Sequence, residues 1–301
     1  MKKFLVVLFL SLFVVGTGFV LVSFAQRSGV DADAHCHVPD LPSNANSEKL
    51  AARADAKGCV FKTIYEGEGL DPSFILATPQ PVLKSEERGL KWLVQAQAAN
   101  GGFGSGTHVR QDIIDPHAVS ADPATTAMVG MALLRLGNSL EKGEHSNQLK
   151  RATDYILEQV EKAPKGAINI TTLQGTQIQS KLGANIDVAL SAQFLTNLSA
   201  KLGEQHPMKL RTMRALNTCV SMIQRSQNSD GSVQGDGWAG VLQSSFAANA
   251  LESAKSVGAE VDEEALDLAR NYQKANVDVE NGGVATDRAA GVTLYAVSGS
   301  S

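Results

Sequence analysis

Apolar residues recur at helical spacing from about residue 82 onward, in eight segments of two alternating kinds. Segments of the first kind are amphipathic and carry many charges; they span 85–97, 148–162, 208–227 and 262–274. Segments of the second kind have almost no charge and are rich in Ala, Ser and Gly; they span 123–136, 188–200, 239–251 and a short 289–297. A helix without a charged face must be covered on all sides. The pattern therefore predicts charged outer helices around small-residue inner helices.

Acidic residues mark the expected helix starts. Asp122 followed by Pro123 is an N-cap with proline in the first turn, and Asp262 precedes two further acids at the start of its segment. Asp187 could cap segment 188–200 in the same way.

The junction after each charged segment is also repeated. A glutamine (Gln97, Gln159, Gln227 and Gln273) is followed by a glycine and then by an apolar residue (Phe103, Ile168, Val233 and Val284). We expect the glutamine to hydrogen-bond into the turn and the glycine to adopt a positive φ. The apolar residue should pack back between outer helices.

This junction resembles the QW repeat of squalene-hopene and oxidosqualene cyclases, whose α/α-toroid fold is shared by protein prenyltransferase β subunits. The first copy matches best: Arg88-Gly89, Trp92-Leu93, Gln97 and Gly101-Gly102-Phe103. The resemblance covers about residues 82–301 and implies an all-α fold, an α/α toroid of outer and inner helices. Only four hairpins can be identified, whereas closed toroids of the family have five to seven. The ring would be open, truncated or completed by a partner, for example in an oligomer.

The chemistry of those families is not carried over with the fold. The cyclases use an Asp-x-Asp-Asp acid, which this chain lacks, since Asp31 and Asp33 have no third carboxylate beside them. The prenyltransferases hold zinc with Asp, Cys and a distant His, and Cys219 has Asn217-Thr218 before it instead. We expect Cys219 to be a buried core residue, and we expect no cofactor and no metal.

The N-terminus predicts export. Lys2 and Lys3 precede an uncharged apolar run from residue 4 to 24, which is typical of a secretory signal cleaved before Gln26. The run is also long enough for a retained membrane anchor. Both alternatives place the rest of the chain outside the cytoplasm, in the periplasm or secreted, with residues 26–81 as a low-complexity tether and 82–301 as the repeat domain.

Two cysteines lie in the tether. In an oxidising compartment we expect Cys36 and Cys59 to form a disulfide. The alternative is a metal site built on His35, Cys36 and His37, but adjacent ligands of this kind are geometrically awkward.

The charge balance excludes one class of partner. Lys and Arg total 27 against 31 Asp and Glu, and no basic run is present. A nucleic-acid partner is therefore not expected.

In a ring of helical hairpins the loops from outer to inner helices lie at one end. The first two loops, about 98–122 and 164–186, exceed the usual length of loops in compact domains. Two imidazoles and several carboxylates in the first loop could act in acid–base chemistry: His108, Asp112, Asp115, His117 and Asp122. The alternative is that they cap helices and fill loop packing. Polar and aromatic residues of the later loops are candidates for ligand binding: Gln177, Asn185, Asp187, Asp236 and Trp238.

These observations favour an exported toroid domain that binds a small molecule, a glycan or a protein partner without cyclase chemistry. The alternative is an enzyme with its site in the loop mouth, such as a polysaccharide lyase or hydrolase. An isoprenoid-binding or isoprenoid-modifying protein is a third alternative, which rests on the fold resemblance alone.

Overall fold

The structure of the chain is a computed structural model, and it describes residues 80–233, 240–278 and 283–284. Contacts divide the chain into two units, Met1–Asp71 and Pro72–Ser301, and the described residues all belong to the second. The predicted segment 289–297 lies outside the described residues.

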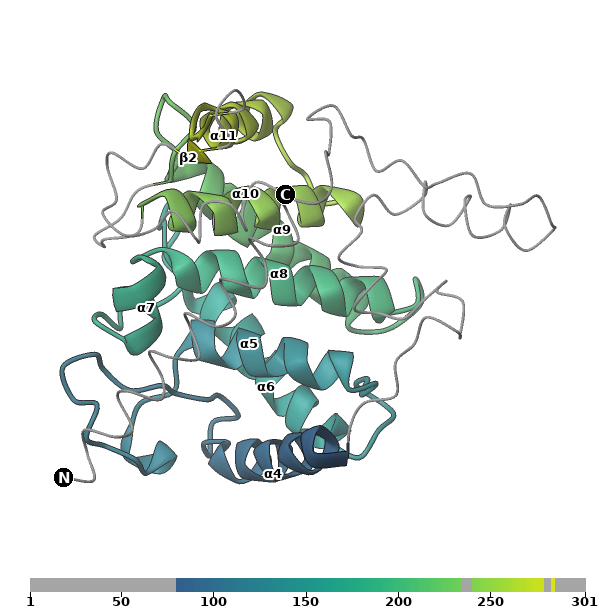
Figure 1. The fold of residues 1–301 in the computed structure, drawn as a ribbon. Helices are drawn as coiled ribbons and strands as arrows, with labels where there is room; N and C mark the ends of the chain where they lie inside the picture. The colour runs from purple at the N-terminus through teal and green to yellow at the C-terminus, as the bar shows by residue number, and fades with distance from the viewer. Residues whose placement is uncertain (1–79, 234–239, 279–282, 285–301) are drawn as a thin grey trace, which may run out of the picture. The chain divides into compact units, whose positions relative to one another are not determined.

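The described part is all-helical apart from one short strand pair (Figure 1). Its α-helices are α4 (Gln80–Ala96), α5 (Pro123–Arg135), α6 (Ser146–Lys162), α7 (Gln177–Leu182), α8 (Ile186–Lys201), α9 (Lys209–Arg225), α10 (Gly240–Ser256) and α11 (Glu263–Ala275). A 3-10 helix spans Pro116–Ala118, and β1 (Val277–Asp278) pairs antiparallel with β2 (Gly283–Val284). The seven long helices lie where the sequence predicts them, although α4 begins at Gln80 and so includes two residues assigned to the tether.

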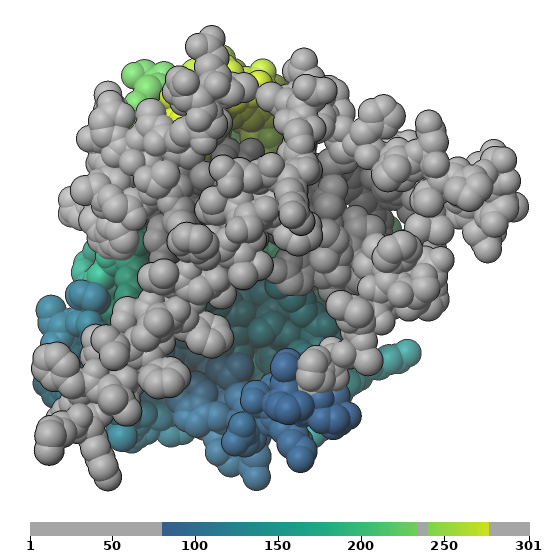
Figure 2. Space-filling view, viewed as in Figure 1, coloured from purple at the N-terminus to yellow at the C-terminus, as the bar shows by residue number. Residues whose placement is uncertain are grey.

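The helices form two layers. In the first layer α8 lies between α5 and α10 and packs against both. In the second layer α6 packs on α5, α9 on α8 and α11 on α10, so each of these three charged helices covers the small-residue helix that precedes it. Figure 2 shows that α4 and α11 belong to opposite ends of the described part, coloured blue and yellow-green.

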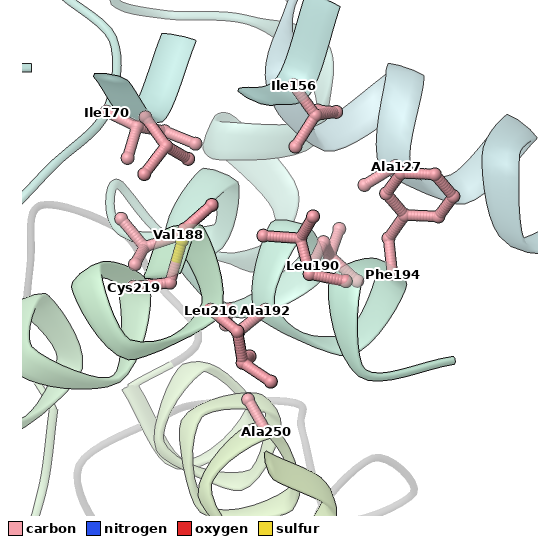
Figure 3. Close-up of a cluster of buried hydrophobic side chains, with 14 of the residues drawn as sticks. Ala127, Ile156, Ile170, Val188, Leu190, Ala192, Phe194, Leu216, Cys219 and Ala250 are labelled. Carbon is pink, nitrogen blue, oxygen red and sulfur yellow. The ribbon is translucent and has the colours of Figure 1, made fainter. Parts of the chain in front are cut away.

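Burial confirms that α8 is covered on nearly all sides, and most residues of α5 and α10 are buried as well. Twelve of the 16 residues of α8 are buried, and Phe194 and Leu195 are completely so. Small residues allow the close approach that this requires, because a Cβ at Gly130 of α5 would lie 2.6 Å from the ring of Phe194. The cluster around α8 draws side chains from α5, α6, α9 and α10 (Figure 3).

Two of the predicted helix caps are confirmed and one is wrong. Asp122 accepts the backbone N–H of Thr125 at 2.7 Å, and Asp262 accepts those of Glu264 and Ala265. Asp187 does not precede its helix, because α8 already begins at Ile186.

Cys219 is buried in the core, as predicted, and burial raises the pKa of its thiol to about 12. Among the described residues no helix is both long and apolar enough to span a bilayer. The apolar run of residues 4–24 and the cysteines Cys36 and Cys59 lie outside them.

Candidate functional site

The predicted glutamine junction is present at two of its four places. Gln97 donates from Nε2 to the carbonyl of Gly101 at 2.8 Å and to that of Gln148, in the first turn of α6, at 2.9 Å. Gln227 donates in the same way to the carbonyl of Gly231 and, at 2.8 Å, to that of Ala265 in α11. Each of these glutamines thus joins its own turn to the start of the next outer helix; we call this arrangement the glutamine clamp.

The turns beside both clamps are alike. Gly101 and Gly231 have φ of 87° and 85°, as expected from their role. Added Cβ atoms would lie 2.5 Å and 2.0 Å from the carbonyl oxygens of Arg151 and Leu268 on the next outer helix. Glycine is therefore required at both positions by conformation and by space.

A second repeated contact fixes the apolar residue after each turn. Phe103 and Val233 are both buried, as predicted. The N–H of Phe103 donates to Oγ1 of Thr126 in α5 at 2.9 Å, and the N–H of Val233 donates to Oγ of Ser244 in α10 at 3.0 Å. A hydroxyl on the inner helix thus satisfies the buried backbone of the loop.

The second and fourth junctions differ from the prediction. Ile168 is 47% exposed, and Ile170 is buried in its place, in the same core cluster as Ile156 and Cys219 (Figure 3). The buried apolar residue thus comes two residues later than the repeat predicts, and its N–H donates to the side chain of Asn169 and not to a hydroxyl of the inner helix. Gln273 accepts a bond from Ser245 of α10, and no partner of its Nε2 is found among the described residues, which do not include 279–282 of the following turn.

The first two long loops join into one surface, although about 70 residues separate them in the sequence. Thr107 and Thr176 form a β-bridge, the N–H of Gln177 donates to Gly106 at 2.8 Å, and Nδ1 of His108 lies 2.7 Å from Oε1 of Gln177. We call residues 104–120 together with 171–183 the paired-loop surface. The structure thus brings His108 and Gln177 together, a pair that the sequence left in separate groups.

Two aliphatic side chains project from this surface. Val109 is 85% exposed and Ile114 is 90% exposed. Between them Arg110 forms a two-bond ion pair with Asp112, at 2.9 and 3.0 Å. The surface thus presents two exposed aliphatic groups with an ion pair between them.

The five acid–base candidates do not form one site. Asp112 is paired with Arg110, and Asp115 caps the 3-10 helix by accepting the N–H of His117. Nε2 of His117 lies 3.0 Å from the carbonyl of Gln95 in α4, away from the bond between His108 and Gln177. Within the described residues no group of three His, Cys, Asp or Glu side chains is placed to hold a metal ion.

The remaining candidates include two buried carboxylates at the start of the inner helices. Asp122 is 1% exposed and accepts bonds from Thr125 and from the N–H of Ser105. Asp187 is completely buried; its Oδ1 accepts the N–H of Ala124 at 3.1 Å, and its Oδ2 accepts from Nε2 of Gln179 at 2.7 Å. Asp187 therefore caps α5, its neighbour, and not its own helix.

The environment of these carboxylates disfavours their charged forms. Burial raises the pKa of Asp187 to about 6. The hydrogen bond from Gln179 acts in the opposite direction and lowers this pKa, whereas the nearby charge of Asp122 raises it. Burial also raises the pKa of Asp122, and the hydrogen bonds that Asp122 accepts from Thr125 and Ser105 only partly offset this rise. Tyr155 of α6 donates to the carbonyl of Ala121, and burial together with both carboxylates raises its pKa.

Of the predicted ligand-binding residues, Gln177 alone lies on the paired-loop surface. Asn185 precedes α8 without a capping bond from its side chain, and Asp187 is buried. Asp236 and Trp238 lie outside the described residues. Gln179, the partner of Asp187, was not among the predicted ligand-binding residues, although its place three residues after Thr176 is typical of a capping box.

Comparisons of the chain with protein-family models, with curated proteins and with solved structures found no match. The resemblance to the QW repeat therefore rests on the residues of this chain alone.

Proposed function

We propose that this chain is an exported α/α-toroid domain protein that binds a ligand or a protein partner through its paired-loop surface. The N-terminal sequence supports export, and the two layers of helices with repeated clamps support a toroid-like scaffold. We propose no cyclase chemistry, since the cyclase acid motif is missing from the sequence.

The observation that carries the proposal is the exposure of two aliphatic side chains on the paired-loop surface. Val109 and Ile114 are almost fully exposed on loops that are otherwise pinned by hydrogen bonds. His108 and Gln177 add polar groups beside them, so the surface offers both apolar contact and hydrogen bonding. The first of these loops, residues 104–120, carries both aliphatic side chains, and a hydrogen-bonded loop loses little conformational entropy on binding.

The acid–base alternative has weaker support. An acid or base must reach within hydrogen-bonding distance of the substrate. Asp122 and Asp187 have raised pKa values but are buried, whereas His108, Asp112 and His117 are exposed and bonded to different partners.

The test is a binding screen of the full chain on a glycan array and in a thermal-shift panel of small molecules. A ligand that uses the surface should lose at least tenfold in affinity when Ile114 is changed to Asp, with the melting temperature unchanged. The matched control is Leu210→Asp, since Leu210 is 61% exposed on α9, outside the paired-loop surface. Equal losses in the two variants, or catalytic turnover of the ligand, would overturn the proposal.

A further inference from the structure

The short helix α7 has the features of a movable element. It has six residues, of which only Gln179 is buried, and two glycines flank it with φ of 69° at Gly175 and 105° at Gly183. A segment with so few buried contacts belongs to the least stable parts of a fold. The flanking glycines can absorb the changes in backbone dihedral angle that opening requires.

Apolar and polar contacts hold α7 to the body of the domain, and its partly buried Ile178 and Leu182 pack against the core. Nε2 of Gln179 donates to Oδ2 of Asp187 at 2.7 Å and to the carbonyl of Leu173 at 2.9 Å. Its Oε1 accepts the N–H of Thr176 and completes the capping box of α7. At the other end of α7, Gly183 lies directly against the side chain of Gln243 in α10.

We propose that α7 is a lid over the buried carboxylate of Asp187, and that rising pH favours its opening while falling pH keeps it closed. The proposal does not depend on what the paired-loop surface binds.

The direction of this pH dependence follows from the charge that is buried when α7 is closed. Two ionisable groups lie beside Asp187, Asp122 at the start of α5 and Tyr155 on α6, and the charge acting on Asp187 comes from Asp122. His108 faces α7 from the first loop, where its Nδ1 lies 2.7 Å from Oε1 of Gln177. Lys181, the basic residue of α7, is exposed to solvent. The closed state therefore buries Asp187 beside another acid, which favours its neutral form.

Proton linkage gives the size of the effect. When α7 opens, water reaches Asp187 and its pKa falls from about 6 toward the ordinary value of 3.8. The open state binds fewer protons, so the opening constant should rise about tenfold per pH unit between these two values. The total rise is about 100-fold and levels off above pH 6.

Amide hydrogen exchange of the full chain tests this. The N–H groups of Ser180 and Gly183 bond within and beside α7 and report its opening, whereas amides of α8 report global unfolding. After correction for intrinsic exchange, opening of α7 should increase from pH 4 to 6 beyond any change seen in α8. Asp187→Asn should flatten this profile, and Asp112→Asn, which removes an exposed carboxylate, should leave it unchanged. A profile that is flat or falling in the native chain, or unaltered in Asp187→Asn, overturns the proposal.

A second variant keeps the test valid if Asp187→Asn does not fold. A Cβ at Gly183 would lie 1.5 Å from Oε1 of Gln243 at a φ that disfavours side chains, so Gly183→Ala should hold α7 open at every pH. Gly166→Ala is the matched control, because Gly166 has a similar positive φ of 83° but nothing within 4 Å of the added atom. Retained protection of α7 in Gly183→Ala would show that α7 does not close against α10, and would overturn the lid.

Discussion

The contact between Gly130 and Phe194 gives the sharpest test of the packing between α5 and α8. In Gly130→Ala the added Cβ would lie 2.6, 2.9 and 3.0 Å from three ring carbons of Phe194. Phe194 is completely buried, so its ring has no solvent-filled space into which it can move. The substitution therefore forces the two inner helices apart or the ring out of its rotamer.

Two effects of opposite sign decide the magnitude. Replacing glycine by alanine within a helix stabilises it by about 1 kcal/mol. Inserting a methyl group into a close-packed core costs about 1–3 kcal/mol. The second effect is at its upper end here because all three contacts lie at or below 3.0 Å, so we expect a net loss of about 1–2 kcal/mol in the free energy of unfolding.

Urea denaturation followed by circular dichroism measures this loss as a lower midpoint. The control is Gly89→Ala on α4, where nothing lies within 4 Å of the added atom, and whose midpoint should equal or exceed that of the native chain. Adding Phe194→Leu to Gly130→Ala should cost less than the sum of the single substitutions, because the smaller side chain makes room for the methyl group. A midpoint of Gly130→Ala at or above that of the native chain would refute the close packing of α5 on α8.

Three further predictions concern the junctions, the buried acid and the buried thiol. Gln97→Ala should lower the free energy of unfolding by about 1–3 kcal/mol through loss of its three side-chain hydrogen bonds, whereas Gln159→Ala should lie within about 0.5 kcal/mol of the native chain in the same urea experiment. The pKa of Asp187 is raised from 3.8 to about 6, so its contribution to stability is present below pH 3.8 and is lost as the pH rises through 6. The expected loss in the free energy of unfolding is about 3 kcal/mol. The free energies of unfolding measured at pH 4 and pH 7 should therefore differ less in Asp187→Asn than in the native chain. Cys219 is completely buried with a raised pKa, so iodoacetamide should modify it only after denaturant is added; modification of the native chain, detected by mass spectrometry, would contradict its burial.

The sequence predicts the helices of this fold well because the two kinds of helix differ in composition. The scarcity of charge in 188–200 could be explained only by cover on all sides, and α8 is covered. The glutamine and glycine of the first and third junctions were also predictable, because a turn with positive φ restricts the residue types that can occupy it.

The candidate site was predicted less well, and the reason lies in hydrogen bonds between distant loops. Nothing in the local sequence around His108 indicates that Gln177 will be its partner. Similarly, Asp187 looks like a cap for its own helix, and only the packing of α8 against α5 directs its carboxylate to Ala124. Contacts that depend on the tertiary arrangement of helices leave no pattern within a single segment.

The irregular second hairpin explains why the polar groups gather where they do. In the first and third hairpins a hydroxyl on the inner helix binds the loop backbone, as Thr126 does for Phe103. In the second hairpin Asn169 takes over this role from within the loop, and α7 occupies the additional length. Because α7 brings Gln179 to the start of α8, Asp187 gains a partner that lets it remain buried. The departure from the repeat thus accounts for both the partner of the buried carboxylate and the loop that pairs with residues 104–120.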